Sequence, residues 1–397
     1  MKLPIIVLKE STLSIDAVRR SSEFVLVSAK AKGRGIEHQK LEVEIKDANA
    51  NEIRDLKSEK GVIAAALRMP VVRVRPLGSV APGANPPKIS WGITAVGADK
   101  SPLTGAGVTV AVLDTGIDHT HGSFKGVQFI QRNFTQDSAE DEDGHGTHCA
   151  GTIFGRDVKG TRIGIAKGVS NALIGKVIGK EGGSTEEIIR AVTWALSNGA
   201  HVISMSLGMD YVGLQRELVK TYGLSEERAT SLALAGYRDN IRVFDKLSAA
   251  VSSQGVIFNS AIVAAAAGNE SNRPDYAVTV APPAGAESFL SVGAIGPTAD
   301  PKSYAIANFS NEGARFAAPG VDIWSAKPGG GLAADSGTSM AAPHVAGVAA
   351  LWAEKLLAAK AFSAARAIDM MAASSKSLEP TVSINDARHG LVQAPLA

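Results

Sequence analysis

The sequence predicts an α/β fold in which a parallel sheet carries helices on both faces, preceded by a small α+β domain. Two observations lead to this fold. After about residue 90, short continuous apolar runs alternate with segments of helical spacing, as expected for strands buried on both faces. Before that point, apolar and charged residues alternate one by one, as in a half-buried strand. A chain of 397 residues is long enough for both domains.

The N-terminal domain is expected to cover residues 1–77, followed by a linker at 78–90 that is rich in Pro, Gly, Ala and Ser. Its expected elements are a strand at 24–29, an alternating strand at 41–46, a helix at 51–60 ended by Gly61, and a strand at 72–75 stopped by Pro76. The larger domain is expected at 91–397.

The two parts differ in charge. Residues 1–88 hold 16 Lys and Arg against 10 Asp and Glu, a net charge of +6, and the remainder holds 25 against 29, a net charge of −4. A basic segment joined to an acidic domain indicates either a partner within the chain or a nucleic-acid arm. No aromatic residue interleaves with the basic ones at 71–75 and no nucleic-acid motif is present, so we expect no nucleic-acid partner.

The larger domain is expected to alternate strands and helices. A helix is predicted at 185–197, with Ser184 as its cap and Glu186 and Glu187 in its first turn. Functional residues should lie at the carboxyl ends of the strands. The predicted strands are 108–113, 172–178, 201–207, 261–267 and 289–294.

Three motifs supply an Asp, a His and a Ser in that order. They are V-A-V-L-D-T-G with Asp114, G-H-G-T-H-C-A-G with His145, and S-G-T-S-M-A-A-P-H-V-A-G with Ser339. A serine hydroxyl is a weak nucleophile, so a His must take its proton and a carboxylate must orient that His. The order Asp, His, Ser differs from that of α/β-hydrolases and of chymotrypsin-like enzymes. A hydrolytic catalytic triad is therefore predicted.

From about Trp91 to the C-terminus the chain resembles the subtilisin-like serine proteases, on the strength of these three motifs. The resemblance implies a serine endopeptidase that needs no cofactor for its chemistry and acts on peptides or proteins. It also identifies A-A-A-G-N-E at 265–270 as the oxyanion segment, so that the Asn269 amide and the backbone N–H of Ser339 would stabilise the developing negative charge.

The same resemblance implies a groove that holds an extended peptide as an added strand. Met209 stands where the family usually has Gly, and could either narrow the pocket for the residue before the cut or turn away. Ala281, also at a usual Gly position, would make that pocket shallower and favour small or medium apolar residues. The substrate-binding residues implied are Gly182, Gly183, Ser206, Leu207, Gly208, Ala267 and Gly268.

The N-terminal domain resembles the propeptide inhibitor of subtilisins by pattern and position. We therefore expect a zymogen that cleaves itself, with the basic domain staying bound in cis as an inhibitor. The expected bond is Leu77-Gly78, within a wider interval from Arg75 to Lys88. The alternative is a permanent N-terminal domain.

Metal ligands and membrane segments give weaker signals. The acidic run at 137–144 lacks the spacing of a calcium-binding helix–loop–helix loop, so a solvated acidic loop is expected and no metal site is predicted, although structural calcium is common in the family. Cys149 is expected to be a buried filler. The apolar stretch at 3–8 is too short for a signal peptide, and no run is long enough to span a bilayer. The chain as written would be cytoplasmic, or exported if a leader was removed.

Two alternatives to a peptidase stay open: a non-peptidase serine hydrolase, such as an esterase or amidase, and an inactive binding protein on a protease fold. The segment at 210–258 is longer than the usual family connection by some tens of residues. A helix should start near Ser225 and stop near Gly255. This insertion would be extra helical packing, a lid or a partner surface.

Overall fold

The computed structural model describes residues 2–13, 27–32, 35–73, 85–252, 261–300 and 303–396. Its largest sheet has the strand order β14-β13-β12-β10-β6-β8-β7, with β15 beside β13. All of these neighbours are parallel except β13 and β14. The predicted α/β fold class is confirmed. The strands are β6 (Thr109–Asp114), β7 (Gln128–Asn133), β8 (Asn171–Lys176), β10 (Val202–Met205), β12 (Ile262–Ala266), β13 (Leu290–Pro297), β14 (Tyr304–Ile306) and β15 (Phe316–Pro319).

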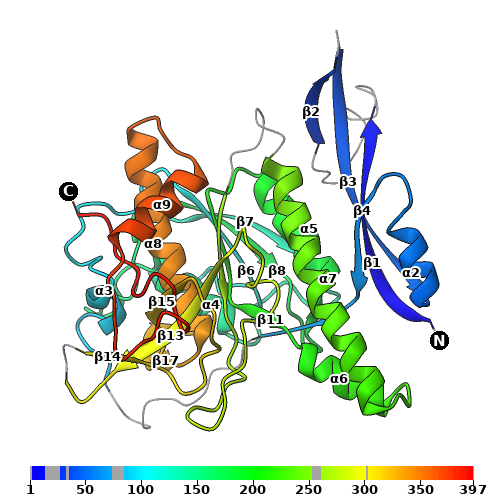
Figure 1. The fold of residues 1–397 in the computed structure, drawn as a ribbon. Helices are drawn as coiled ribbons and strands as arrows, with labels where there is room; N and C mark the ends of the chain where they lie inside the picture. Colours follow the sequence, from blue (N-terminus) through cyan, green and yellow to red (C-terminus); the bar gives the residue numbers. More distant parts are fainter. Residues whose placement is uncertain are drawn as a thin grey trace.

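Helices cover both faces of this sheet (Figure 1). Val110 and Val112 of β6 pack into one core with α4 and α8, whereas Ala111 and Leu113 pack into a second core with α5 and α7. Strict alternation between two apolar cores explains why the strands read as continuous apolar runs. The helices of the body are α3 (Trp91–Ala95), α4 (His145–Phe154), α5 (Thr185–Ser197), α6 (Tyr211–Lys220), α7 (Glu226–Ser252), α8 (Thr338–Ala358) and α9 (Ala364–Ser374), with a 3-10 turn η1 (Gly122–Phe124).

The described N-terminal residues form a separate antiparallel sheet of order β2-β3-β1-β4, accompanied by the helix α2. This sheet stands beside α5, α6 and α7 on one side of the molecule (Figure 1). Ile5 and Leu67 belong to the same apolar cluster as Phe244 of α7 and Val263 of β12. The N-terminal sheet therefore shares a core with the body. Its elements are β1 (Leu3–Leu13), β2 (Val27–Lys32), β3 (Gly35–Ala48), α2 (Ala50–Leu56) and β4 (Val62–Leu67).

The strand β5 (Pro70–Arg73) leaves the N-terminal sheet and pairs with the body instead. It is the middle strand of a three-stranded sheet, antiparallel to β9 (Gly183–Ser184) on one side and β11 (Leu207–Met209) on the other. The N-terminal segment thus lies between two edges of the larger domain. A separate two-stranded sheet is formed by β16 (Ile323–Ala326) and β17 (Leu332–Asp335).

The insertion at 210–258 contains the helices α6 and α7, which pack on each other, and α7 also packs against β4. The helix start near Ser225 was predicted, and α7 begins at Glu226. The predicted stop at Gly255 and the predicted cleavage bond at Leu77-Gly78 lie outside the described residues. In the described part of the chain, none of the helices is both long and apolar enough to cross a membrane.

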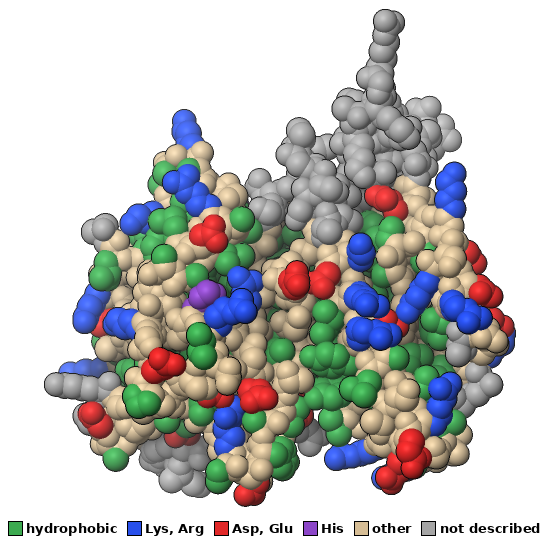
Figure 2. Space-filling model, viewed as in Figure 1, with side chains coloured by type: hydrophobic (Ala, Val, Ile, Leu, Met, Phe, Trp, Pro, Cys, Tyr) green, Lys and Arg blue, Asp and Glu red, His purple; other side chains and the backbone are tan. Residues whose placement is uncertain are grey.

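Charged side chains of both signs are interspersed on the face drawn in Figure 2. Lys and Arg side chains lie on the N-terminal domain and on the body alike in this view, with acidic side chains between them. On this face, the difference in net charge between the two parts therefore does not produce one basic and one acidic surface.

Candidate active site

The first two residues of the predicted triad meet where a strand ends and a helix begins. Asp114 is the last residue of β6, and His145 is the first residue of α4. The Nδ1–H of His145 donates a hydrogen bond of 2.7 Å to Oδ1 of Asp114. Both residues are buried. This contact fixes the ring so that Nε2 is left to act as a base.

The electrostatics of His145 suit that role. Burial alone would lower its pKa, but the Asp114 carboxylate opposes this effect and holds the pKa of His145 well above its ordinary value near 6.5. A neighbouring carboxylate favours the charged imidazole. The Asp114–His145 pair can therefore hold a proton that has been taken from a nucleophile.

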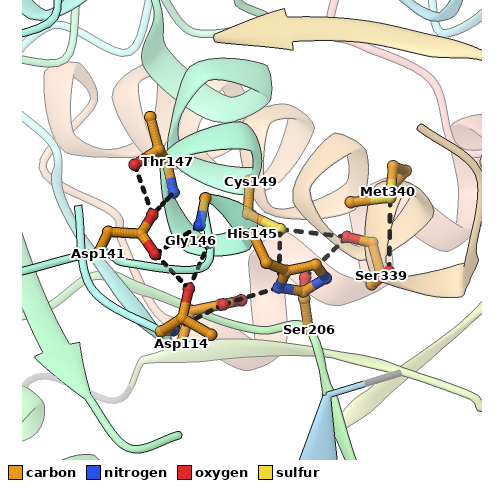
Figure 3. A network of polar contacts seen from close by, with 11 residues as sticks. Asp114, Asp141, His145, Gly146, Thr147, Cys149, Ser206, Ser339 and Met340 are labelled. Atoms are coloured by element: carbon orange, nitrogen blue, oxygen red, sulfur yellow. Dashed lines mark hydrogen bonds and ion pairs between the residues drawn. The ribbon is translucent and has the colours of Figure 1, made fainter. Parts of the chain in front are cut away.

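Ser339 is the second residue of α8, at the positive end of the helix dipole. Its carbonyl accepts a hydrogen bond of 2.8 Å from Oγ of Ser206, and its hydroxyl lies 3.4 Å from Sδ of Met340. Figure 3 shows Ser339 beside the His145 ring. Within the described residues, Nε2 of His145 is buried and has no hydrogen-bond partner. The triad is gathered, but the hydroxyl does not donate to the base in this structure.

Asn269 follows β12, and its side chain is oriented by Thr338. The backbone N–H and the hydroxyl of Thr338 both donate to Oδ1 of Asn269, each at 2.9 Å. A Cβ built on Gly337 would lie 2.8 Å from Oγ of Ser339 and 3.0 Å from Nδ2 of Asn269. The amide nitrogen and the hydroxyl therefore face the same small space, as an oxyanion donor and a nucleophile must.

Thr338 was not singled out in the sequence, although it directly precedes Ser339. Its role depends on a contact with Oδ1 of Asn269, 69 positions earlier in the chain. No local pattern encodes such a contact, so the sequence indicates Asn269 as a candidate donor but does not reveal the residue that orients it.

The strand β5 pairs with two strand edges that contain glycine, β9 and β11. Val71 pairs with Gly183, Val72 with Gly208, and Arg73 with Leu207. Gly182 has a φ of +90°, and a Cβ there would lie 2.8 Å from the carbonyl oxygen of Val71. Glycine is thus required for the backbone to approach this closely. The geometry is that of a peptide added as a strand.

Met209 lies beside the segment of Ala281, because its backbone N–H donates to the carbonyl of Pro282 at 2.8 Å. Met209 pairs with Val71, at the end of β11 away from Ser206, and its Sδ lies 4.0 Å from Oγ1 of Thr185. Its buried side chain therefore faces Thr185, the first residue of α5. The backbone N–H of Ala281 donates to the carbonyl of Ala267, which precedes Gly268 in the oxyanion segment.

Cys149 is buried one helical turn after His145, with its Sγ 3.4 Å from the carbonyl oxygen of Ser339. Burial raises the pKa of its thiol, so it is an unreactive neutral filler at ordinary pH. Among the described residues, Asp114, His145 and Cys149 form a group compact enough to hold a metal ion. Two members of this group, Asp114 and His145, also belong to the predicted triad.

The acidic run at 137–144 is only partly the solvated loop that was expected. Glu140, Glu142 and Asp143 are exposed, but Asp141 is only 7% exposed. Its carboxylate turns inward toward the start of α4 (Figure 3). The expectation was wrong for this residue because the run's composition does not reveal which member finds buried donors.

Comparison with known proteins shows which sequences this chain resembles. Residues 105–387 match the model of the subtilase family. The chain is 36% identical over 272 residues to "Subtilisin-like protease 6" of Trichophyton verrucosum (strain HKI 0517), a match that covers 66% of this chain and 57% of that protein. It is also 36% identical over 254 residues to "Intracellular serine protease" of Paenibacillus polymyxa, covering 62% of this chain and 67% of that protein. The chain thus spans little more than half the length of the fungal relative.

Proposed function

Because this chain belongs to the subtilase family, we propose that it is a serine endopeptidase made as a self-processing zymogen. In this proposal Ser339 attacks the peptide carbonyl, His145 takes its proton, and Asp114 orients and stabilises the charged imidazole. Asn269 and the backbone N–H of Ser339 stabilise the oxyanion.

One observation carries the proposal that the substrate is a peptide. The chain's own segment Pro70–Arg73 lies between β9 and β11 as an antiparallel strand. An esterase that accepts small substrates has no need for two strand edges that pair with an extended backbone. The groove therefore supports a peptidase over the esterase or amidase alternative.

The same segment supports inhibition in cis by the N-terminal domain. While β5 occupies both edges, a substrate cannot pair with them. In the full-length chain Asp114, His145 and Ser339 are all buried. An occupied groove and a covered nucleophile are the features expected of a zymogen.

The register of β5 adds a second candidate for the processing bond. Arg73 pairs with Leu207, and the preceding Ser206 contacts Ser339. A substrate peptide bound in the register of β5 and longer by one residue would pair with Ser206, so we add the Val74-Arg75 bond as a candidate. Cleavage at Leu77-Gly78, which stays a prediction, would require the strand to slide by three residues, or about 10 Å at the rise of an extended chain.

The proposal is tested by comparing a peptide amide with a simple ester as substrates. We expect the full-length chain, after a lag, to hydrolyse both, and Ser339→Ala to hydrolyse neither. Hydrolysis of the ester alone would favour the non-peptidase alternative. Hydrolysis of neither by the parent chain would favour an inactive binding protein.

A further inference from the structure

The carboxylate of Asp141 accepts four hydrogen bonds around the catalytic pair. Oδ1 accepts from the hydroxyl of Thr115 and from the backbone N–H of Gly144, each at 2.8 Å. Oδ2 accepts from the backbone N–H of Thr147 at 2.9 Å and from its hydroxyl at 2.5 Å. Each oxygen of Asp141 therefore accepts hydrogen bonds from two donors, as suits the acceptor groups of a carboxylate.

These donors flank the two catalytic side chains. Thr115 directly follows Asp114, while Gly144 and Thr147 lie on either side of His145. Thr115 also contacts α4 directly, because its Oγ1 accepts a hydrogen bond of 2.9 Å from the backbone N–H of Gly146. Figure 3 shows Asp141 joining the strand end to the first turn of α4. Asp141 itself touches neither His145 nor Asp114 in this network.

The helix start needs this carboxylate. The N-cap residue of α4 is Gly144, which offers no side-chain cap, and the first turn contains no acidic side chain. Asp141 supplies the missing acceptor from outside the helix, next to the positive end of its dipole. The turn and the helix are also in direct contact, because a Cβ on Gly146 would lie 2.2 Å from the carbonyl oxygen of Gly116.

We infer that Asp141 is a positioning residue, which acts through Thr115 and the first turn of α4 to hold His145 in line with Asp114. This inference rests on the proposed function for its consequence in catalysis, but its geometric content concerns only the Asp114–His145 hydrogen bond. A displacement near 1 Å of a catalytic group costs about a hundredfold in rate.

The first test uses a spectroscopic signature. In full-length Ser339→Ala, which should not cut itself, the proton between Nδ1 of His145 and Asp114 should give a far-downfield ¹H NMR signal. Asp141→Asn replaces an acceptor oxygen with an amino group that faces donors, so this signal should shift upfield or disappear. Asp143→Asn removes the same charge two residues away, on the exposed side, and should leave the signal in place.

An unchanged signal in Asp141→Asn would overturn the inference. If Asp141→Asn also loses the dispersed methyl signals of the core, the variant has failed to fold. Two variants of Thr115 then test the inference instead. Thr115→Ser keeps the hydroxyl and should keep the downfield signal, whereas Thr115→Val should lose it. Equal spectra for these two variants would contradict the inference. None of these outcomes depends on whether the protein cleaves peptides.

The second test is kinetic and uses the active chain. Asp141→Asn should lower kcat by about a hundredfold with KM within about threefold, because substrate binding at β9 and β11 is untouched. Asp143→Asn should keep both parameters within about twofold. A raised KM at constant kcat would show that Asp141 serves the groove instead.

Discussion

At the scale of single residues, the proposed mechanism assigns covalent chemistry and charge stabilisation to different side chains. Ser339→Ala and His145→Ala should each abolish hydrolysis of a peptide amide. Asn269→Ala removes one oxyanion donor and should leave a slow enzyme, with turnover reduced by about a hundredfold or more, or about 3 kcal/mol. The measurement is kcat on a peptide amide after processing, and full turnover by Asn269→Ala would contradict the oxyanion assignment.

The pH dependence of activity follows from His145. Because the pKa of His145 lies well above its ordinary value and only the neutral ring accepts a proton, kcat/KM should rise with pH through an ionisation above 6.5. Neutralising Asp141 and Asp143 together should move this rising limb to lower pH, since less negative charge is then left near His145 to stabilise its imidazolium form. The profile is measured at low salt, and an unmoved limb would show that the acidic run has no influence on His145.

Acid stability depends on two other histidines. Burial lowers the pKa of His148 and of His344 to about 4. His148 donates from Nε2 to the carbonyl of Ile323, and His344 donates from Nδ1 to the carbonyl of Met340. Both rings are therefore neutral in the folded state. The unfolded chain binds these protons near pH 6.5, so stability present above pH 6.5 is lost as the pH falls toward 4.

Between pH 7.5 and pH 5, each of these two histidines should cost about 2 kcal/mol of stability. Urea unfolding of full-length Ser339→Ala at both pH values gives the sum over all titrating groups, so the share of His344 is read from a variant. His344→Gln should lose less stability than its parent over this range. An equal loss would mean that His344 is not the group that titrates.

At the scale of elements, the sequence predicted those whose pattern is local. The helix expected at 185–197 is α5 (Thr185–Ser197). It could be predicted because the apolar spacing and the acidic residues of the first turn lie within the segment itself. The run at 201–207 was expected to be one strand, but β10 ends at Met205 and β11 begins at Leu207. Ser206 breaks the strand because its side chain turns to the carbonyl of Ser339, a partner that no local pattern reveals.

The strands β1 and β4 were not predicted, again because contacts far along the sequence decide their burial. The apolar start of the chain was considered only as a targeting segment, yet Leu3–Leu13 is the strand between β3 and β4. Its Ile5 and Leu8 are fully buried, in part through contacts with the body that lie far along the sequence. Tertiary contacts of this kind also decide why Asp141 is buried while its acidic neighbours are exposed.

Among the described residues, the insertion contacts the N-terminal domain through a buried hydrogen bond and a partly exposed ion pair. Asn240 of α7 donates to the carbonyl of Leu67 at 2.9 Å, and Lys57 contacts Asp239 at 2.6 Å. Asn240→Ala leaves a buried carbonyl without its donor, at a cost of about 1–3 kcal/mol. Lys57→Met removes a partly exposed pair worth less than about 1 kcal/mol.

Asn240→Ala should therefore shorten the lag before full activity more than Lys57→Met does, if the insertion holds the inhibitor in place. The lag is followed with a peptide substrate at fixed protein concentration. Equal lags in the two variants would assign the insertion to extra packing alone.

At the scale of the whole molecule, apolar burial joins the N-terminal domain to the body. Met69 and Val71 are fully buried in the cluster that also holds Ile188 of α5 and Met205 of β10. Opposite net charges across a hydrated surface add little to such a contact, so burial contributes most of the affinity. Cutting the chain after β5 would leave this shared core intact, and the cut domain should stay bound until it is digested.

The central claim is that this chain cuts itself, using Ser339, beyond the strand that occupies its groove. Intact mass over prolonged incubation tests this claim most directly, with full-length Ser339→Ala as the control. The parent chain should convert to two fragments that meet at one bond between Val74 and Lys88, with Leu77-Gly78 and Val74-Arg75 as the two candidates, while Ser339→Ala keeps its full mass. A parent chain that stays at full length while it still hydrolyses added peptide would contradict the account and make residues 1–77 a permanent domain.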